Sequence, residues 1–252
     1  MNYNPRLRNG FFYSNKNCMK RLLLIFIFCI AAFYSNAQLA IIQDPDGYVN
    51  LRAKPDVSSD ILMKVTTADV FFCFEEEAKG DWYAADVYSN GEQNQFGYID
   101  KYRVKFIYDY DSLSVSQLLK DKIVFKNKTI EVEIKTKPFD PKANTIEYTS
   151  EGASYRYVKT INHKKAWGTD GGIPRVAYEY VNVTIEGNKI SLPKGAYDHL
   201  FEPTLTYMNV NYDVKNDILY IQGLNGDGAG GYIFAIIIKN KKFERTVTMI
   251  PF

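Results

Sequence analysis

The residues of this chain that could perform acid–base or metal chemistry gather in the second half of the sequence. Carboxylates occur there at Asp170, Asp198, Glu202 and Asp227. Two carboxyl groups held about 5–10 Å apart across a cleft can serve as acid and base in glycoside hydrolysis, and carboxylate and carbonyl oxygens are ligands that Ca²⁺ prefers. A carboxylate-dependent wall or glycan hydrolase is therefore one alternative, and a calcium loop at Asp227 is another.

The other familiar catalytic sets are incomplete. Cys73 is the only cysteine after residue 37, and the apolar run 70–74 around it predicts a buried, unreactive thiol. The two histidines, His163 and His199, lack neighbours at the short spacing of zinc ligands. The glycines at 226–231 precede an apolar strand rather than a helix with Lys-Ser/Thr, which argues against a phosphate loop. We therefore assign no catalytic residue, no metal ligand set and no cofactor.

Three stretches contain more glycine, proline and aromatic residues than strand alternation requires, namely 167–174, 196–203 and 225–232. Irregular segments on a rigid scaffold often carry binding residues. We expect the three loops to gather at one end of a sheet, with Trp167 or Tyr197 as an apolar wall. The candidate site comprises Trp167, Asp170, Tyr197, Asp198 and Asp227. The alternative is structural: the aspartates fix their own turns and Trp167 fills the edge of a core.

The elements that must position these residues are mostly strands. Apolar side chains alternate in paired runs separated by polar turns, which predicts four hairpins in an antiparallel domain over 122–252. Ile130, Val132 and Ile134 should share one face. So many strands must curl or split into two layers to bury that face. The connector 108–121 should contain a short helix at 114–120, and a second helical turn is expected at 193–201. The hairpins are expected at 123–135, 176–192, 206–222 and 232–249.

The region 39–107 has its own set of landmarks. Gly-Tyr-Val-Asn-Leu-Arg-Ala-Lys-Pro at 47–55, Trp-Tyr at 82–83 and Gly-Tyr-Ile at 97–99 occur in order. Over about 41–107 they resemble the bacterial SH3-like (SH3b) domain. The resemblance implies a small barrel that often binds cell-wall peptides. An aromatic groove on it would use Tyr48, Trp82, Tyr83, Tyr98 and Tyr102, although the plainer interpretation makes Trp82 a residue at the edge of the core. The fold class is thus mainly β: a signal peptide, a small SH3-like barrel, and a larger antiparallel β domain with one or two short helices.

Taken together, the three loop stretches of the second domain resemble the corresponding stretches of a group of exported bacterial β proteins. The shared series reads Trp-Gly-Thr-Asp-Gly, Ala-Tyr-x-x-Leu-Phe-x-Pro and Gly-Asp-Gly-Ala-Gly-x-Tyr in this sequence. No activity comes with that resemblance.

Residues 1–37 have the order of a secretory signal peptide. Lys20 and Arg21 precede the apolar run 22–33, and Tyr-Ser-Asn-Ala at 34–37 follows, which predicts cleavage near Ala37. Met19 is an alternative start. The run is shorter than the roughly 20 residues that span a bilayer, so we expect no permanent membrane span. The mature protein is expected in the periplasm or at the cell surface.

Composition narrows the partners. The chain has 46% hydrophobic and 24% charged residues, as globular proteins do. Five of its 31 basic residues and none of its 29 acidic ones precede residue 38, so the remainder has a net charge of −3. That balance argues against nucleic acid. Our leading hypothesis is a non-enzymatic protein that binds a peptidoglycan peptide or an envelope protein, and a periplasmic immunity or inhibitor protein is the alternative outside enzymes.

Overall fold

The computed structural model describes residues 37–89, 93–149, 156–226 and 228–250, and residues 37–252 pack as one compact unit. This part of the chain is mainly β, with antiparallel sheets, as expected. Its helical segments are single 3₁₀ turns, and among the described residues no helix is long and apolar enough to cross a membrane. The predicted signal peptide and Asp227 lie outside the described residues.

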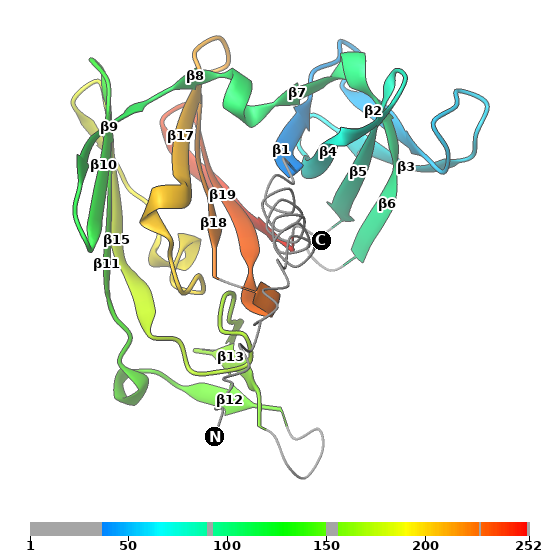
Figure 1. The fold of residues 1–252 in the computed structure, drawn as a ribbon. Coiled ribbons are helices and arrows are strands. Elements are labelled where there is room, and N and C mark those ends of the chain that lie inside the picture. Colours follow the sequence, from blue (N-terminus) through cyan, green and yellow to red (C-terminus); the bar gives the residue numbers. More distant parts are fainter. Residues whose placement is uncertain (1–36, 90–92, 150–155, 227, 251–252) are drawn as a thin grey trace, which may run out of the picture. The chain divides into compact units, whose positions relative to one another are not determined.

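An antiparallel sheet of seven strands comes first, in the order β3-β2-β6-β5-β4-β1-β7 (Figure 1). Apolar residues alternate along its strands, so that Val49 and Leu51 of β2 face one buried cluster together with Phe71 and Ile99. The predicted buried thiol, Cys73, belongs to the same cluster. The strands are β1 (Ala37–Ile42), β2 (Tyr48–Arg52), β3 (Ile61–Thr66), β4 (Val70–Lys79), β5 (Trp82–Ser89), β6 (Gln93–Asp100) and β7 (Val104–Phe106).

The connector differs from the prediction. Ser114–Leu118 forms strand β9, which pairs antiparallel with β10, and not a helix. The spacing of Val115, Leu118 and Leu119 suits a helical face, but so short a segment gains little as an isolated helix, and hydrogen bonds to a neighbouring strand replace it. The connector also contains the end of η2 (Ile107–Asp109) and the strand β8 (Asp111–Ser112), whereas η1 (Lys101–Arg103) lies before it, between β6 and β7.

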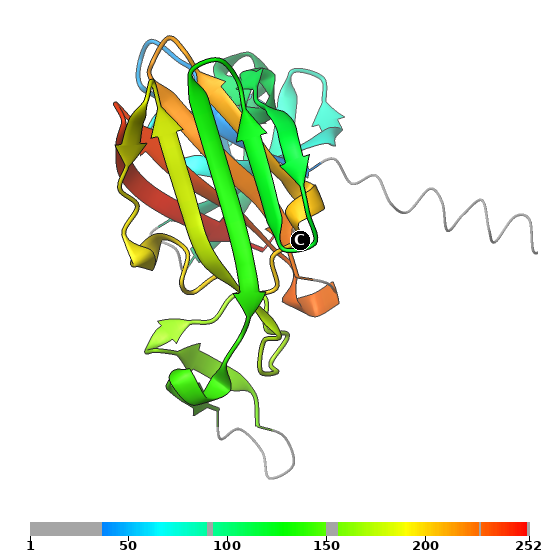
Figure 2. The same cartoon turned by 90° about the vertical axis from the view of Figure 1, so that its left-hand side faces the viewer.

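Two sheets of five strands make up most of the second half. The first, in the order β16-β15-β11-β10-β9, faces the viewer in Figure 2. Its remaining strands are β10 (Lys122–Lys126), β11 (Ile130–Pro138), β15 (Val176–Ile185) and β16 (Asn188–Ile190). The second sheet has the order β20-β19-β18-β17-β8. It contains β17 (Met208–Asp213), β18 (Ile218–Asn225), β19 (Tyr232–Lys239) and β20 (Lys242–Met249).

The remaining elements are short. A small sheet of β12, β13 and β14 extends from the sandwich, and four 3₁₀ turns lie in the loops. The turn η4 coincides with the helical turn expected at 193–201. These elements are β12 (Ile146–Tyr148), β13 (Val158–Ile161), β14 (Lys164–Lys165), η3 (Pro141–Ala143), η4 (Lys194–Ala196), η5 (Leu205–Tyr207) and η6 (Gly228–Gly230).

The two five-stranded sheets pack face to face, as the prediction of two layers required. All four expected hairpins are present, as the pairs β10–β11, β15–β16, β17–β18 and β19–β20. Ile130, Val132 and Ile134 share the inner face of β11, where they meet Phe234 and Ile236 of the opposite sheet in one cluster. This sandwich core is the scaffold that holds the loops.

The strand β19 is buried on both faces. Phe234 and Ile236 point into the sandwich core, whereas Ala235 and Ile237 point the other way, into a second cluster that also contains Phe72 of β4. The first sheet of the chain therefore covers the outer face of β17–β20. This double burial explains why 232–238 is apolar without alternation.

Candidate functional site

The predicted aromatic groove of the first sheet does not form as one surface. Tyr83 is paired with Ile99, and its ring packs 5.3 Å from that of Phe106, so it faces the buried cluster. Trp82 and Tyr98 are the strand neighbours of these two residues and therefore lie on the opposite face. Tyr83 and Trp82 consequently cannot line the same groove.

The two other predicted groove residues make local contacts. Lys64 Nζ lies 4.1 Å from the centre of the Tyr48 ring. Tyr102 is exposed, and its hydroxyl donates to Asp81 Oδ1 at 3.0 Å. Tyr98 accepts a hydrogen bond from Lys79 Nζ at 2.8 Å. Trp82 and Tyr98 share the face opposite the buried cluster, and these two residues and the exposed Tyr102 are what is left of the predicted groove.

The three loop stretches of the second domain do converge. The Trp167 N–H donates to the carbonyl of His199 at 3.0 Å, and the Phe201 N–H donates back to the carbonyl of Trp167 at 3.0 Å. The Gly226 N–H donates to the carbonyl of Glu202 at 3.1 Å. The expectation that these loops gather at one place is confirmed.

A buried amide holds the loops together. Asn225 is fully buried, and its Nδ2 donates to the hydroxyls of Tyr178 at 2.8 Å and Tyr232 at 2.9 Å. Its Oδ1 accepts from the N–H of Thr204 at 3.0 Å, and the Tyr232 hydroxyl donates to the carbonyl of Phe201 at 2.9 Å. The network has no access to a ligand, so much of the loop sequence serves the fold.

A small hollow remains where two of the loops meet. It has a volume of about 300 Å³, and its walls include Trp167, Asp170 and Gly230. Lys165 Nζ lies 3.7 Å from the centre of the Trp167 ring, which also contacts Tyr232 with ring centres 5.9 Å apart. Trp167 thus forms the apolar wall expected of it, and Asp170 lies beside it. Asp227, which was also predicted to face this space, lies outside the described residues.

The other carboxylates of the predicted set have basic partners elsewhere. Asp198 accepts two hydrogen bonds from Lys164 Nζ, at 2.7 and 2.9 Å. Glu202 accepts from the backbone and the guanidinium of Arg175. In the described ranges no group of three or more His, Cys, Asp or Glu side chains could hold a metal ion. This arrangement does not favour a carboxylate pair acting on a shared substrate.

Tyr197 and His199 lie away from the hollow. The Tyr197 ring packs 6.2 Å from that of Tyr178. His199 Nδ1 is 3.6 Å from Asp198 Oδ1, too far for a hydrogen bond. Burial lowers the pKa of His199 below its ordinary value, against the opposing effect of Asp198. The imidazole is therefore neutral at physiological pH.

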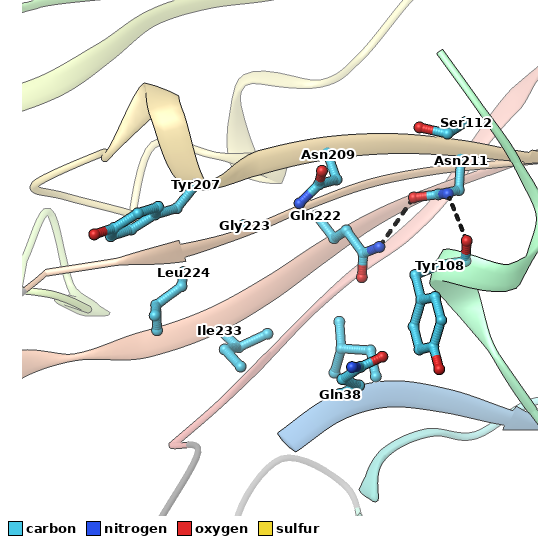
Figure 3. Close-up of a pocket in the computed structure, with 11 residues that line it drawn as sticks. Gln38, Tyr108, Ser112, Tyr207, Asn209, Asn211, Gln222, Gly223, Leu224 and Ile233 are labelled. Carbon is cyan, nitrogen blue, oxygen red and sulfur yellow. Dashed lines mark hydrogen bonds between the residues drawn. The ribbon is translucent and has the colours of Figure 1, made fainter. Parts of the chain in front are cut away.

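A pocket lined in part by amide side chains was not predicted. It has a volume of about 330 Å³ and lies on the outer face of β17–β19, where β1 and the connector meet that sheet (Figure 3). We call it the junction pocket. It is lined by Gln38, Leu39, Tyr108, Ser112, Tyr207, Asn209, Asn211, Gln222, Gly223, Leu224 and Ile233.

Four amide side chains contribute to this pocket, those of Gln38, Asn209, Asn211 and Gln222. Asn211 is buried at its back, where its Nδ2 donates to the carbonyls of Tyr110 at 3.2 Å and Tyr108 at 3.4 Å. Its Oδ1 accepts from Gln222 Nε2 at 3.1 Å, as Figure 3 shows. This chain of hydrogen bonds fixes the Gln222 amide, and within the described part of the chain the side-chain oxygen of Gln222 has no hydrogen-bond partner. The side chain of Asn209 is exposed at the front.

A buried acceptor faces the same space. Gln38 Oε1 is inaccessible to solvent and has no hydrogen-bond partner within the described part of the chain. An unpaired buried acceptor costs about 1–3 kcal/mol of desolvation.

The junction pocket carries no ionised side chain among its described lining residues. Burial, reinforced by the neighbouring Glu75, raises the pKa of Tyr108 to about 12, so its hydroxyl stays protonated. The pocket therefore offers amide and hydroxyl groups beside the apolar surfaces of Tyr207 and Leu224. Asn209 and Asn211 are visible in the sequence as polar positions alternating with apolar ones, but such a pattern is typical of any solvent-facing strand.

No protein-family model, curated protein or solved structure matches this chain. The resemblances based on its motifs thus remain predictions, and the ligand has to be argued from the pocket itself.

Proposed function

We propose that this chain is an exported, non-enzymatic binding protein of the cell envelope that holds a short segment of a cell-wall peptide in the junction pocket. The observation that carries the proposal is the amide lining of this pocket. It is formed jointly by β1, the connector and the sheet β17–β19. Neither half of the chain contains the site by itself.

The lining suits a peptide because amides pair with amides. Asn and Gln side chains each offer donors and an acceptor, like the peptide bond. The side-chain oxygen of Gln222 can take an N–H group, and the exposed Asn209 can both donate and accept. Tyr207 offers a large ring that is 60% exposed, a kind of side chain that often dominates binding energy.

The predicted cleavage site adds a charge to this chemistry. If the signal peptide is removed after Ala37, Gln38 becomes the first residue and its α-amino group lies at the edge of the pocket. An α-amino group is largely protonated near neutral pH. It would complement a peptide carboxylate, which wall peptides carry in addition to their amide bonds. A volume near the lower end of that of small-molecule sites limits the ligand to a short segment.

Hydrolysis of a wall glycan is supported less well. The carboxylates that would perform it, Asp198 and Glu202, are engaged by Lys164 and Arg175. An immunity or inhibitor role has no specific feature in its favour. Binding is the function for which the structure offers a formed site.

Co-sedimentation with purified peptidoglycan tests the proposal. The mature chain beginning at Gln38 should be retained, and Tyr207→Ala should weaken retention by about tenfold, as the loss of a central aromatic contact does. Tyr102→Ala is the matched control, since Tyr102 is also largely exposed, at 73%, but lies in the turn between β6 and β7 of the first sheet.

Three outcomes would count against this proposal. Absence of retention above that of a soluble control protein would contradict wall binding. Equal retention of wild type and Tyr207→Ala would contradict the junction pocket. Loss of retention in Tyr102→Ala alone would transfer the site to the aromatic surface of the first sheet.

A further inference from the structure

A second and larger pocket opens at one end of the sandwich. Its volume is about 810 Å³, well within the range of small-molecule sites. It lies between the two five-stranded sheets, at the ends of β11 and β15, and we call it the end pocket. It is lined by Leu118, Leu119, Lys120, Asp121, Thr136, Lys137, Pro138, Arg175, Val176, Pro203, Thr204, Leu205 and Thr206.

The inside of the end pocket is apolar. Its floor is Leu205, which is buried and belongs to the sandwich core. Val176 and the rings of Pro138 and Pro203 add apolar surface to the walls. The pocket thus leads directly onto the hydrophobic core.

Two leucines of the β9–β10 turn stand at the mouth, and both are half exposed. Leu118 is 50% and Leu119 49% accessible to solvent. Removing these two side chains from water would favour the binding of an apolar ligand. An apolar ligand in the pocket would cover both.

The rim of the end pocket is fixed by backbone hydrogen bonds. The N–H and hydroxyl of Thr136 both donate to the carbonyl of Asp121, at 2.9 and 3.3 Å. The Leu119 N–H donates to the carbonyl of Lys122 at 2.7 Å and closes the turn. These bonds fix the conformation of the turn that carries Leu118 and Leu119.

The charges at the mouth are mostly positive. Lys120, Lys137 and Arg175 line it together with a single acid, Asp121. The guanidinium of Arg175 forms an ion pair with Glu202, with 3.3 Å between Nη2 and Oε2, whereas the side chains of both lysines are exposed. A ligand that fits must therefore combine an apolar body with an anionic end.

From the apolar interior and the basic mouth we infer that the end pocket binds a single-chain anionic amphiphile, such as a fatty-acid carboxylate. The acyl chain lies against Leu118, Leu119 and Leu205. The carboxylate lies between Lys120 and Lys137. This site is separate from the junction pocket, so the inference does not depend on the proposed function.

Titration calorimetry with dodecanoate, kept below its critical micelle concentration, tests the inference on the mature chain. We expect saturable binding of one dodecanoate per protein. Dodecylammonium has the same tail and the opposite charge, and it should bind at least about tenfold more weakly because the lysines repel it. Equal binding of the two ligands, or a stoichiometry well above one, would overturn the inference.

Variants locate the site. The double variant Lys120→Gln, Lys137→Gln should weaken dodecanoate binding by about tenfold, and Leu119→Ser should weaken it by a similar factor. All three side chains are exposed, so these substitutions should not unfold the core. Lys128→Gln is the matched control, because Lys128 is an exposed lysine in the turn that joins β10 and β11. It should leave the affinity unchanged. Binding that is insensitive to the mouth variants, or equally sensitive to Lys128→Gln, would contradict the end pocket.

Discussion

At the scale of single residues, Asn225 joins the three loops through its side-chain amide. Its amide is hydrogen-bonded to the buried hydroxyls of Tyr178 and Tyr232 and to the partly buried N–H of Thr204. Removing the amide leaves those partners unsatisfied. We expect Asn225→Ala to lower the free energy of unfolding by about 2–4 kcal/mol in urea denaturation.

Asn209→Ala provides the comparison, because Asn209 is exposed. It should change stability by less than about 0.5 kcal/mol. If the two alanine variants were equally stable, the role assigned to the Asn225 network would be wrong.

His199 makes stability depend on pH. Burial lowers its folded-state pKa below the ordinary value of 6.5, and Lys164 acts in the same direction, although Asp198 opposes them. The unfolded chain therefore binds the proton more readily. The stabilisation is complete above about pH 6.5 and is lost as the pH falls through the folded-state pKa.

We expect the urea midpoint of the wild type to fall between pH 7 and pH 5, and His199→Gln to flatten this dependence. His163→Gln is the control, since His163 is exposed and its Nδ1 pairs with Glu147 at the surface. A wild-type profile that matched that of His199→Gln would refute the assignment.

At the scale of elements, close approach of the loops limits what Gly168 can become. Its φ is +89°, and a Cβ there would lie 2.6 Å from the carbonyl oxygen of Phe201 and 2.8 Å from the Tyr232 ring. Gly187 also has a positive φ, +78°, but a Cβ there meets nothing within 4 Å. Comparing alanine substitutions at Gly168 and Gly187 therefore separates the cost of a left-handed backbone from the cost of a steric clash with the neighbouring loop.

Thermal unfolding should show this separation. Gly187→Ala should lower the free energy of unfolding by about 1–2 kcal/mol, which is the cost of a left-handed backbone for a residue with a Cβ. Gly168→Ala should cost clearly more, since the backbone of 201 must also move. Equal losses in the two variants would mean that the loops do not pack as closely as the structure indicates.

The strand pattern of the second domain was predictable because it is local. Alternation and turn residues are sufficient to find β10–β11 and β19–β20. Strand β9 was missed because Val115, Leu118 and Leu119 satisfy a helical period, and only the hydrogen bonds to β10 decide otherwise. Convergence of the loops was predictable from their composition, but their closure around Asn225 was not.

At the scale of the whole molecule, the junction pocket could not be predicted because its lining comes from distant segments. Gln38 belongs to β1, Tyr108 to the connector, and Asn209 and Gln222 to the sheet β17–β19. They meet because the apolar residues of β4 and β19 pack together in a shared cluster. A sequence motif reflects residues that are close along the chain. It cannot reveal this pocket, because the pocket forms where the two halves of the chain pack together.

The predicted aromatic groove does not form as one surface because neighbouring residues of a strand point to opposite faces. Trp82 and Tyr83 are adjacent in sequence and look like a unit, but strand geometry sends them to opposite faces. Tyr83 is committed to the core beside Phe106. Adjacent aromatic residues in a strand indicate two surfaces, and pairing with the next strand determines which one is exposed.

The most direct test of the central claim is an NMR titration of the mature chain with soluble peptides released from peptidoglycan. The side-chain amide signals of Asn209 and Gln222 should shift and saturate together, and Tyr207→Ala should weaken that response by about tenfold. The claim would be contradicted if these amides did not respond, or if the saturable shifts were confined to Trp82 and the neighbours of Tyr102 on the first sheet.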